Sequence, residues 1–124
     1  SEMRASDVVD HSDALDEDAL IELVGGDRTL AGELAELFLD DLEPRVTEIT
    51  ASVDGRDADR LRAAAHALRG SAGSLKAANV ANAAGALEAI GHSGTLDGME
   101  EALERLNLAL AALRPRLVAL AGRV

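Results

Sequence analysis

Apolar residues recur at helical spacing along almost the whole chain. They stand three or four residues apart through five stretches, and glycines separate most of these stretches. The predicted helices cover residues 15–24, 27–53, 56–76, 79–90 and 96–120. No stretch alternates β-branched and polar residues as a strand would. The pattern therefore predicts an all-α fold, an up-down four-helix bundle with a short additional N-terminal helix.

The two longest predicted helices each contain a proline, Pro44 in one and Pro115 in the other. A proline removes one backbone donor and crowds the preceding turn. The apolar stripe resumes in phase after Pro44, so we expect a kinked but continuous helix there. The core-facing residues of this helix are predicted to be Leu30, Leu34, Leu37, Phe38, Leu42, Val46, Ile49 and Val53.

The length and composition suit one self-contained domain. A chain of 124 residues can bury about two-thirds of the surface that its unfolded form exposes, and this one has no cysteine for disulfides or thiolate metal sites. We expect residues 1–14 to form a flexible N-terminal segment and residues 15–124 to form the bundle, with Asn79 capping its fourth helix. No apolar run is long enough for a membrane span, so we expect a soluble, cytoplasmic protein. We also expect a monomer.

The net charge of −11 limits the classes of partner. Nucleic acids and anionic membranes would repel such a chain at long range, so we expect neither. The segment from Arg56 to Lys76 differs from the rest, because it carries five cations and only two anions, a net charge of +3. A locally basic helix on an acidic protein suits a transient anion.

His66 lies in the middle of this basic segment. A helical wheel places it nearly opposite the apolar stripe, which predicts an exposed side chain. That stripe consists of Leu61, Ala64, Ala65, Leu68, Ala72 and Leu75. Gly70 and Gly73 share the face of His66, and each costs about 1 kcal/mol relative to alanine inside a helix. Because they face outward, an approaching partner explains them better than packing within the bundle does.

A neutral imidazole is a competent nucleophile for phosphoryl groups. Arg69, three residues after His66, can reach an anion held there. Phosphoryl transfer needs in-line positioning and charge neutralisation, and this helix offers a nucleophile, a cation and open access. The chain has no nucleotide-binding loop of the GxxxxGKS/T or GxGxxG type and no credible cluster of metal-binding carboxylates. We therefore expect no metal site and no cofactor, and a partner must supply the remaining machinery.

A resemblance to a known family rests on ten residues, His66-Ala67-Leu68-Arg69-Gly70-Ser71-Ala72-Gly73-Ser74-Leu75. This stretch resembles the signature of histidine-containing phosphotransfer (HPt) domains, in which an apolar residue, a lysine or arginine, a glycine and small residues follow the acceptor histidine. The resemblance extends from about Leu15 to Leu120. It implies a four-helix bundle that carries a phosphoryl group on His66 between receiver-domain aspartates in a two-component phosphorelay, without kinase machinery of its own.

The resemblance also implies roles for the neighbours of His66. Arg69 would help to neutralise the phosphoryl group, and Gly70 would leave room beside the imidazole. The wheel and the local charge add Arg62, Gly73 and Lys76 as candidates for the same docking face. The implied partners are response-regulator receiver domains or a hybrid histidine kinase, with Mg²⁺ expected only in the receiver domain.

Two positions depart from the family pattern. Family members often carry glycine near the place of Lys76, which either strengthens the basic patch or alters docking. Some members place a glutamine on the next helix to bond the imidazole, and the nearest equivalent is Glu88. If Glu88 meets the ring it would fix the tautomer, and otherwise it is a solvated carboxylate. His92 is explained by the favourable position of a cation near a helix end.

Two alternative functions stay open. The chain could be the phospho-accepting domain of a chemotaxis-type kinase, with ATP as the ultimate donor. It could also be a phosphorylation-independent helical scaffold that binds a protein through the same glycine-notched face. The dimerising phosphoacceptor domain of an ordinary sensor kinase fits less well. Such domains carry an acidic residue directly after the histidine and a proline a few residues later, where this chain has Ala67 and Ser71.

Overall fold

The computed structural model describes residues 14–122, which fold into five helices. The helices are α1 (Glu17–Leu23), α2 (Arg28–Asp54), α3 (Ala58–Ser74), α4 (Ala78–Ser93) and α5 (Met99–Ala121). No strand occurs within the described range, and the predicted all-α class is confirmed. The segment predicted to be flexible, residues 1–14, lies outside the described residues except for Ala14.

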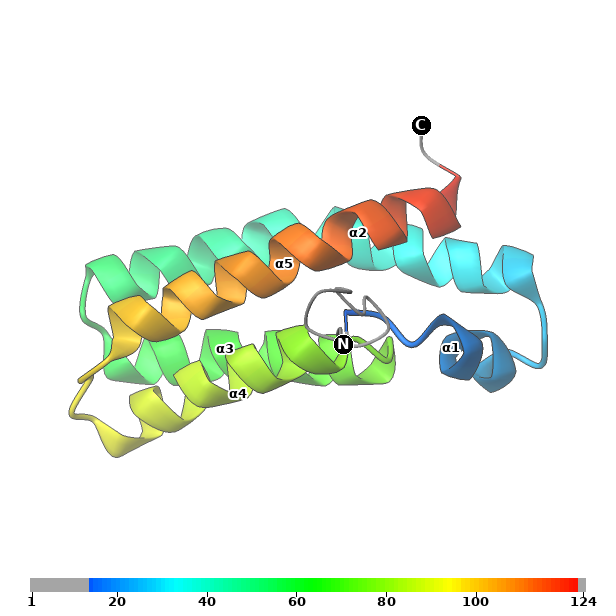
Figure 1. Cartoon of the computed structure of the whole chain (residues 1–124). Coiled ribbons are helices and arrows are strands. Elements are labelled where there is room, and N and C mark those ends of the chain that lie inside the picture. Colours follow the sequence, from blue (N-terminus) through cyan, green and yellow to red (C-terminus); the bar gives the residue numbers. More distant parts are fainter. Residues whose placement is uncertain (1–13, 123–124) are drawn as a thin grey trace, which may run out of the picture.

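The four long helices run alternately up and down, with α2 and α5 forming one layer and α3 and α4 the other (Figure 1). Helix α3 packs on α4 within its layer and on α2 across the layers, and α5 packs on α2 within its layer and on α4 across the layers. The short helix α1 lies at the end of the bundle where α2 begins (Figure 1). The predicted four-helix bundle with an additional N-terminal helix is therefore confirmed. Both α2 and α5 continue through their prolines, Pro44 and Pro115.

Aspartate side chains start the first three helices. Each accepts a hydrogen bond from the backbone N–H three residues further on, which satisfies one donor at the helix end. These caps are Asp16, Asp27 and Asp57. The prediction that Asn79 caps the fourth helix is wrong, because α4 begins after Ala77 without any side-chain cap. The chain turns directly from α3 into α4, and a backbone bond from the Ala77 N–H to the Ala72 carbonyl fixes the turn instead.

The core is made of leucine and alanine side chains. The stripe predicted for α3 faces the core, with Ala64 only half-buried, but the one predicted for α2 is wrong at Leu30 and Leu37. Leu30 is 39% exposed and Leu37 is 61% exposed, while Ala31 and Ala35 are fully buried. Helix α5 lies too close for larger residues, since a Cβ on Gly32 would stand 2.7 Å from a backbone carbonyl of that helix. Close helix packing therefore displaces leucines to the flank of α2.

The contact between α3 and α4 is equally close. Gly91 is buried inside α4, and Gly94, with a φ of +78°, forms the C-cap. A Cβ on Gly91 would stand 2.8 Å from backbone atoms of both Ala58 and Arg62. The absence of that atom allows the second half of α4 to lie directly against the first half of α3. This packing brings α4 side chains within reach of His66.

Candidate functional site

His66 lies in the middle of α3 on its outer face. Its side chain is 63% exposed, as the helical wheel predicts. The neighbouring residues Ala65 and Leu68 are fully buried, so the helix is anchored by one face while the other presents the imidazole. The Asp57 cap and the close packing on α4 fix the start and the rotation of this helix. The exposed imidazole of His66 is therefore carried by a helix whose position is fixed.

Glu88 of α4 contacts both the imidazole and an arginine. Its Oε2 lies 2.8 Å from Nδ1 of His66. Its Oε1 accepts a hydrogen bond from Nε of Arg69, whose NH2 group comes within 3.4 Å of the same Nδ1. Two helices thus bring together a carboxylate, an imidazole and a guanidinium, which we call the His66 cluster. The alternative of a solvated Glu88 carboxylate is wrong.

The Glu88 carboxylate of the His66 cluster is ionised near neutral pH. Hydrogen bonds from Arg69, and secondarily from His66, hold the pKa of its carboxyl group below the usual value of 4.5. An ionised carboxylate only accepts hydrogen bonds, so Nδ1 of His66 must carry the proton between them. In the neutral imidazole the other nitrogen, Nε2, then keeps its lone pair. Nε2 is therefore the ring nitrogen with a free lone pair.

Gly85 makes room for the His66 cluster, although the sequence analysis does not single it out. A Cβ at this position would stand 3.1 Å from Cδ of Arg69. The arginine stem therefore crosses α4 at a place without a side chain before it reaches Glu88. A glycine inside a predicted helix is a sign of close approach. The sequence offers that sign three residues before Glu88.

A shallow hollow beside the cluster is lined by a second arginine and a second histidine. Arg62 and His92 line it together with Arg69 and Glu88. The opposite charges of Arg69 and Glu88 offset each other in their ion pair. Arg62 is exposed and has neither an ion pair nor a hydrogen bond from its side chain to any residue between 14 and 122. Arg62 is thus an uncompensated cation near His66.

Gly70 and Gly73 leave the outer face of α3 open. A Cβ added to either glycine would meet no other atom within 4 Å. Nothing within the described chain therefore requires glycine at these positions. Both glycines face open space, which agrees with their outward position on the helical wheel.

Comparison with known proteins supports the resemblance. The family model of the Hpt domain matches residues 33–116, a range that contains His66 and Glu88. The chain belongs to the Hpt domain family. The crystal structure of histidine-containing phosphotransfer protein B (HptB) from Pseudomonas aeruginosa PAO1 is similar to it, with a TM-score of 0.81 and 24% sequence identity over 90% of this chain and 96% of that one. Among curated protein sequences, none matches.

Lys76 of this Hpt domain lies away from the His66 cluster. It follows the C-cap of α3 with a φ of +68°, a left-handed conformation that favours glycine. Its N–H bonds to the Gly73 carbonyl and the next N–H bonds to the Ala72 carbonyl, which is the Schellman pattern for ending a helix. Ten residues of helical rise separate it from His66 by about 15 Å. The structure brings His66, Arg62, Arg69 and Glu88 together and leaves Lys76 at the helix end.

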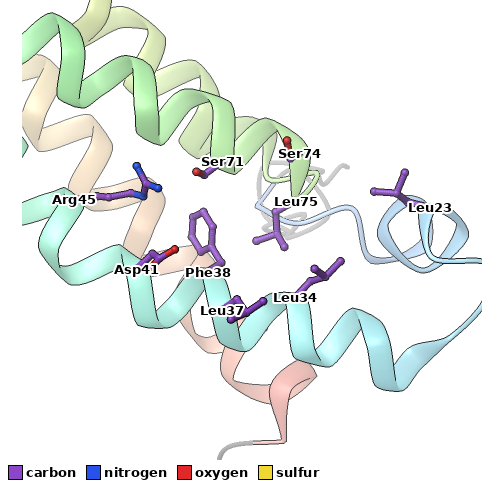
Figure 2. A pocket seen from close by; sticks show the side chains of 9 residues that line it. All are labelled: Leu23, Leu34, Leu37, Phe38, Asp41, Arg45, Ser71, Ser74 and Leu75. Carbon is purple, nitrogen blue, oxygen red and sulfur yellow. The ribbon is translucent and has the colours of Figure 1, made fainter.

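An apolar groove lies on the other side of α3 and was missed by the sequence analysis. It has a volume of about 370 Å³. The lining residues are Leu23, Leu34, Leu37, Phe38, Asp41, Arg45, Ser71, Ser74 and Leu75 (Figure 2). Leu23 and Leu37 are 59% and 61% exposed. Because Leu37 was expected to face the core, the sequence did not predict this groove. The exposure of Leu37 follows from the packing of α2 on α5.

In residues 14–122 no three His, Asp or Glu side chains are arranged to hold a metal ion. Within the same range no helix is both long and apolar enough to cross a bilayer.

Proposed function

We propose that this Hpt domain is a phosphocarrier that accepts a phosphoryl group on Nε2 of His66 from a receiver-domain aspartate and passes it to another. One observation carries the proposal above all. The Glu88 carboxylate holds Nδ1 of an exposed, mid-helix imidazole, which leaves Nε2 free toward solvent. A nucleophile presented in this way, without nucleotide-binding residues beside it, suits transfer from an already phosphorylated partner.

The reaction uses the two ring nitrogens differently. The Nε2 lone pair attacks phosphorus, the N–P bond forms, and the bond from phosphorus to the aspartate oxygen breaks to release the carboxylate. The proton on Nδ1 stays in place, so the ring becomes positively charged as the bond forms. Glu88 faces Nδ1 at 2.8 Å and stabilises this charge. The reverse step returns the phosphoryl group to a second aspartate.

The surrounding residues position and neutralise the phosphoryl group. Arg69 and Arg62 lie on the α4 side of the ring and offer positive charge to its oxygens. Gly70 and Gly73 allow the receiver backbone to come close to Nε2. Mg²⁺ is supplied by the receiver domain, so the carrier itself needs no metal or cofactor. We place the carrier in the cytoplasm as a monomer, with neither nucleic acid nor membrane as a partner.

The apolar groove gives the receiver a place to dock beside the phosphoacceptor. Exposed leucines are costly on a monomer surface unless a partner covers them, and Leu23 and Leu37 lie together at this groove. The groove and the two outward glycines flank the same part of α3. A receiver domain that covers both would bring its aspartate over His66.

The proposal is tested by phosphotransfer from purified receiver domains. Each receiver is labelled with radioactive phosphate and mixed with wild type, His66→Gln or His92→Gln. We expect label on wild type and His92→Gln and none on His66→Gln. His92 is the matched control because it is also exposed on the α3–α4 side of the bundle. Circular dichroism should show equal helix content in all three.

Three outcomes would contradict the phosphocarrier. Equal labelling of His66→Gln would place the phosphoryl group elsewhere. A receiver that binds wild type and His66→Gln equally, with no phosphate uptake from any receiver, would favour the scaffold alternative. Labelling by the ATP-bound core of a chemotaxis-type kinase, but by no receiver, would favour the kinase-domain alternative.

A further inference from the structure

Arg45 of α2 has a buried nitrogen without a partner. Its Nε is shielded from solvent and forms no hydrogen bond with any residue between 14 and 122. The side chain lines the apolar groove, and Figure 2 shows it reaching from α2 toward the helix that carries Ser71. A buried donor left unsatisfied destabilises a fold, so each such group in a native protein calls for an explanation. Here the unsatisfied donor belongs to a cation at the edge of a docking groove.

Asp41 is the residue expected to pair with Arg45, but it does not. It precedes Arg45 by one helical turn, the favourable order and spacing for an intrahelical ion pair, and it lines the same groove. No ion pair joins the two side chains in the described part of the chain, and they point in different directions in Figure 2. Arg45 therefore faces the groove rather than its own helix.

We infer that Arg45 selects the partner by pairing with a carboxylate of the docked receiver domain, beside an apolar side chain that enters the groove. This inference rests on the proposed function. Docking removes water from the guanidinium, and a desolvated cation without a counter-charge opposes binding. A carboxylate supplies both the charge and two oxygens that match the planar guanidinium fork. Receivers without an acidic residue at this place are disfavoured.

The test uses the receiver domain that labels His66 fastest. Its affinity for the full chain is measured by calorimetry for wild type, Arg45→Met and Arg105→Met. Methionine keeps the apolar stem and removes the charged fork. We expect about tenfold weaker binding for Arg45→Met. Arg105→Met makes the same change at an exposed position of α5 that does not line the groove, so it is the matched control, for which we expect no loss.

The salt dependence of the affinity and the kinetics of phosphotransfer distinguish binding through charge pairing from binding through shape complementarity. The difference between wild type and Arg45→Met should shrink as salt is raised, and it should appear in KM of phosphotransfer rather than in kcat. Acidic residues on the receiver surface are then replaced by their amides one at a time. One replacement should weaken binding to wild type about tenfold and have no further effect on Arg45→Met. Equal affinity of wild type and Arg45→Met, or the absence of any coupled receiver residue, would overturn the inference.

Thermal unfolding tests whether Arg45 is instead structural. Removing an unsatisfied buried donor leaves stability unchanged or raises it, so Arg45→Met should melt no lower than wild type. A lower melting temperature would show that Arg45 supports the fold and would overturn the inference. Failure of the proposed function has a different signature, because then no receiver labels wild type. Failure of the Arg45 inference alone leaves the labelling of His66 intact.

Discussion

Glycines on the two sides of α3 have opposite surroundings. On the inner side, a Cβ on Gly91 would stand 2.8 Å from backbone atoms of α3. On the outer side, Gly70 and Gly73 have no atom within 4 Å of such a Cβ. The fold itself requires the inner glycine, whereas nothing in the described chain requires the outer ones. The explanation for the outer glycines must therefore lie in a partner that approaches His66.

The largest effect is expected from Gly91→Ala. The added methyl group cannot fit without separating α3 from α4, because the atoms that it meets belong to the backbone. Overpacking of this kind costs about 2 kcal/mol. Urea unfolding should show the loss as a lower midpoint. The variant should also transfer phosphate more slowly, because a displaced α4 changes the distance between Glu88 and His66.

Gly70→Ala is the matched control, since it places the same methyl group on the other side of α3. It should stabilise the domain by about 1 kcal/mol, the difference between alanine and glycine inside a helix. Gly70→Leu should fold equally well but slow transfer from the receiver, because the larger side chain stands in the approach to Nε2. If Gly70→Leu transferred phosphate at the wild-type rate, an approaching partner would no longer explain the outer glycines.

The sequence predicts the outer face of α3 better than the inner contacts. One helical wheel is enough to place His66, Gly70 and Gly73 outward, because exposure depends on the periodicity of a single helix. The role of Gly91 depends on the distance between two helices, which no local pattern contains. The same limitation explains why Leu37 was expected in the core.

Glu88 links the inner contact to the outer face, and its replacement should give the next largest effect. Glu88→Gln keeps the size of the side chain but removes the charge that holds Arg69 and faces Nδ1 of the His66 imidazole. We expect phosphotransfer about tenfold slower, the size of effect that follows from losing a charge-assisted hydrogen bond. Rapid-quench kinetics with a phosphorylated receiver measures the rate. Glu104→Gln, at an exposed position of α5, is the control.

The contribution of Glu88 to the free energy of unfolding should depend on pH. The pKa of the Glu88 carboxyl group is lowered in the folded domain from its ordinary value of 4.5, so its contribution to stability is present above about that pH. It is lost as pH falls through the lower folded pKa. The stability difference between wild type and Glu88→Gln should therefore shrink in acid. A difference that stays constant from pH 6 to pH 3 would contradict the ion pair in solution.

The contact between Glu88 and His66 illustrates what a sequence leaves open. The helical wheel places Glu88 at the flank of the fourth predicted helix, where a solvated carboxylate and a partner of the ring are equally compatible with the pattern. The structure decides between them because Gly85 and Gly91 allow both the Arg69 stem and the helix itself to come close. Two glycines on one helix, six residues apart, are the sequence signal for that approach.

The smallest effect is expected at Lys76, where the chain lacks a glycine that its backbone favours. A left-handed conformation costs a side-chain-bearing residue about 1 kcal/mol, and glycine recovers part of this while gaining freedom in the unfolded chain. Lys76→Gly should therefore stabilise the domain by about 0.5 kcal/mol. Lys76→Ala removes the charge but keeps the strained backbone, so it should unfold at the wild-type midpoint. Both variants should transfer phosphate at the wild-type rate, since Lys76 ends α3 far from the His66 cluster. If both slowed transfer equally, the lysine charge would belong to the docking face and the outer face of α3 would extend to the end of the helix.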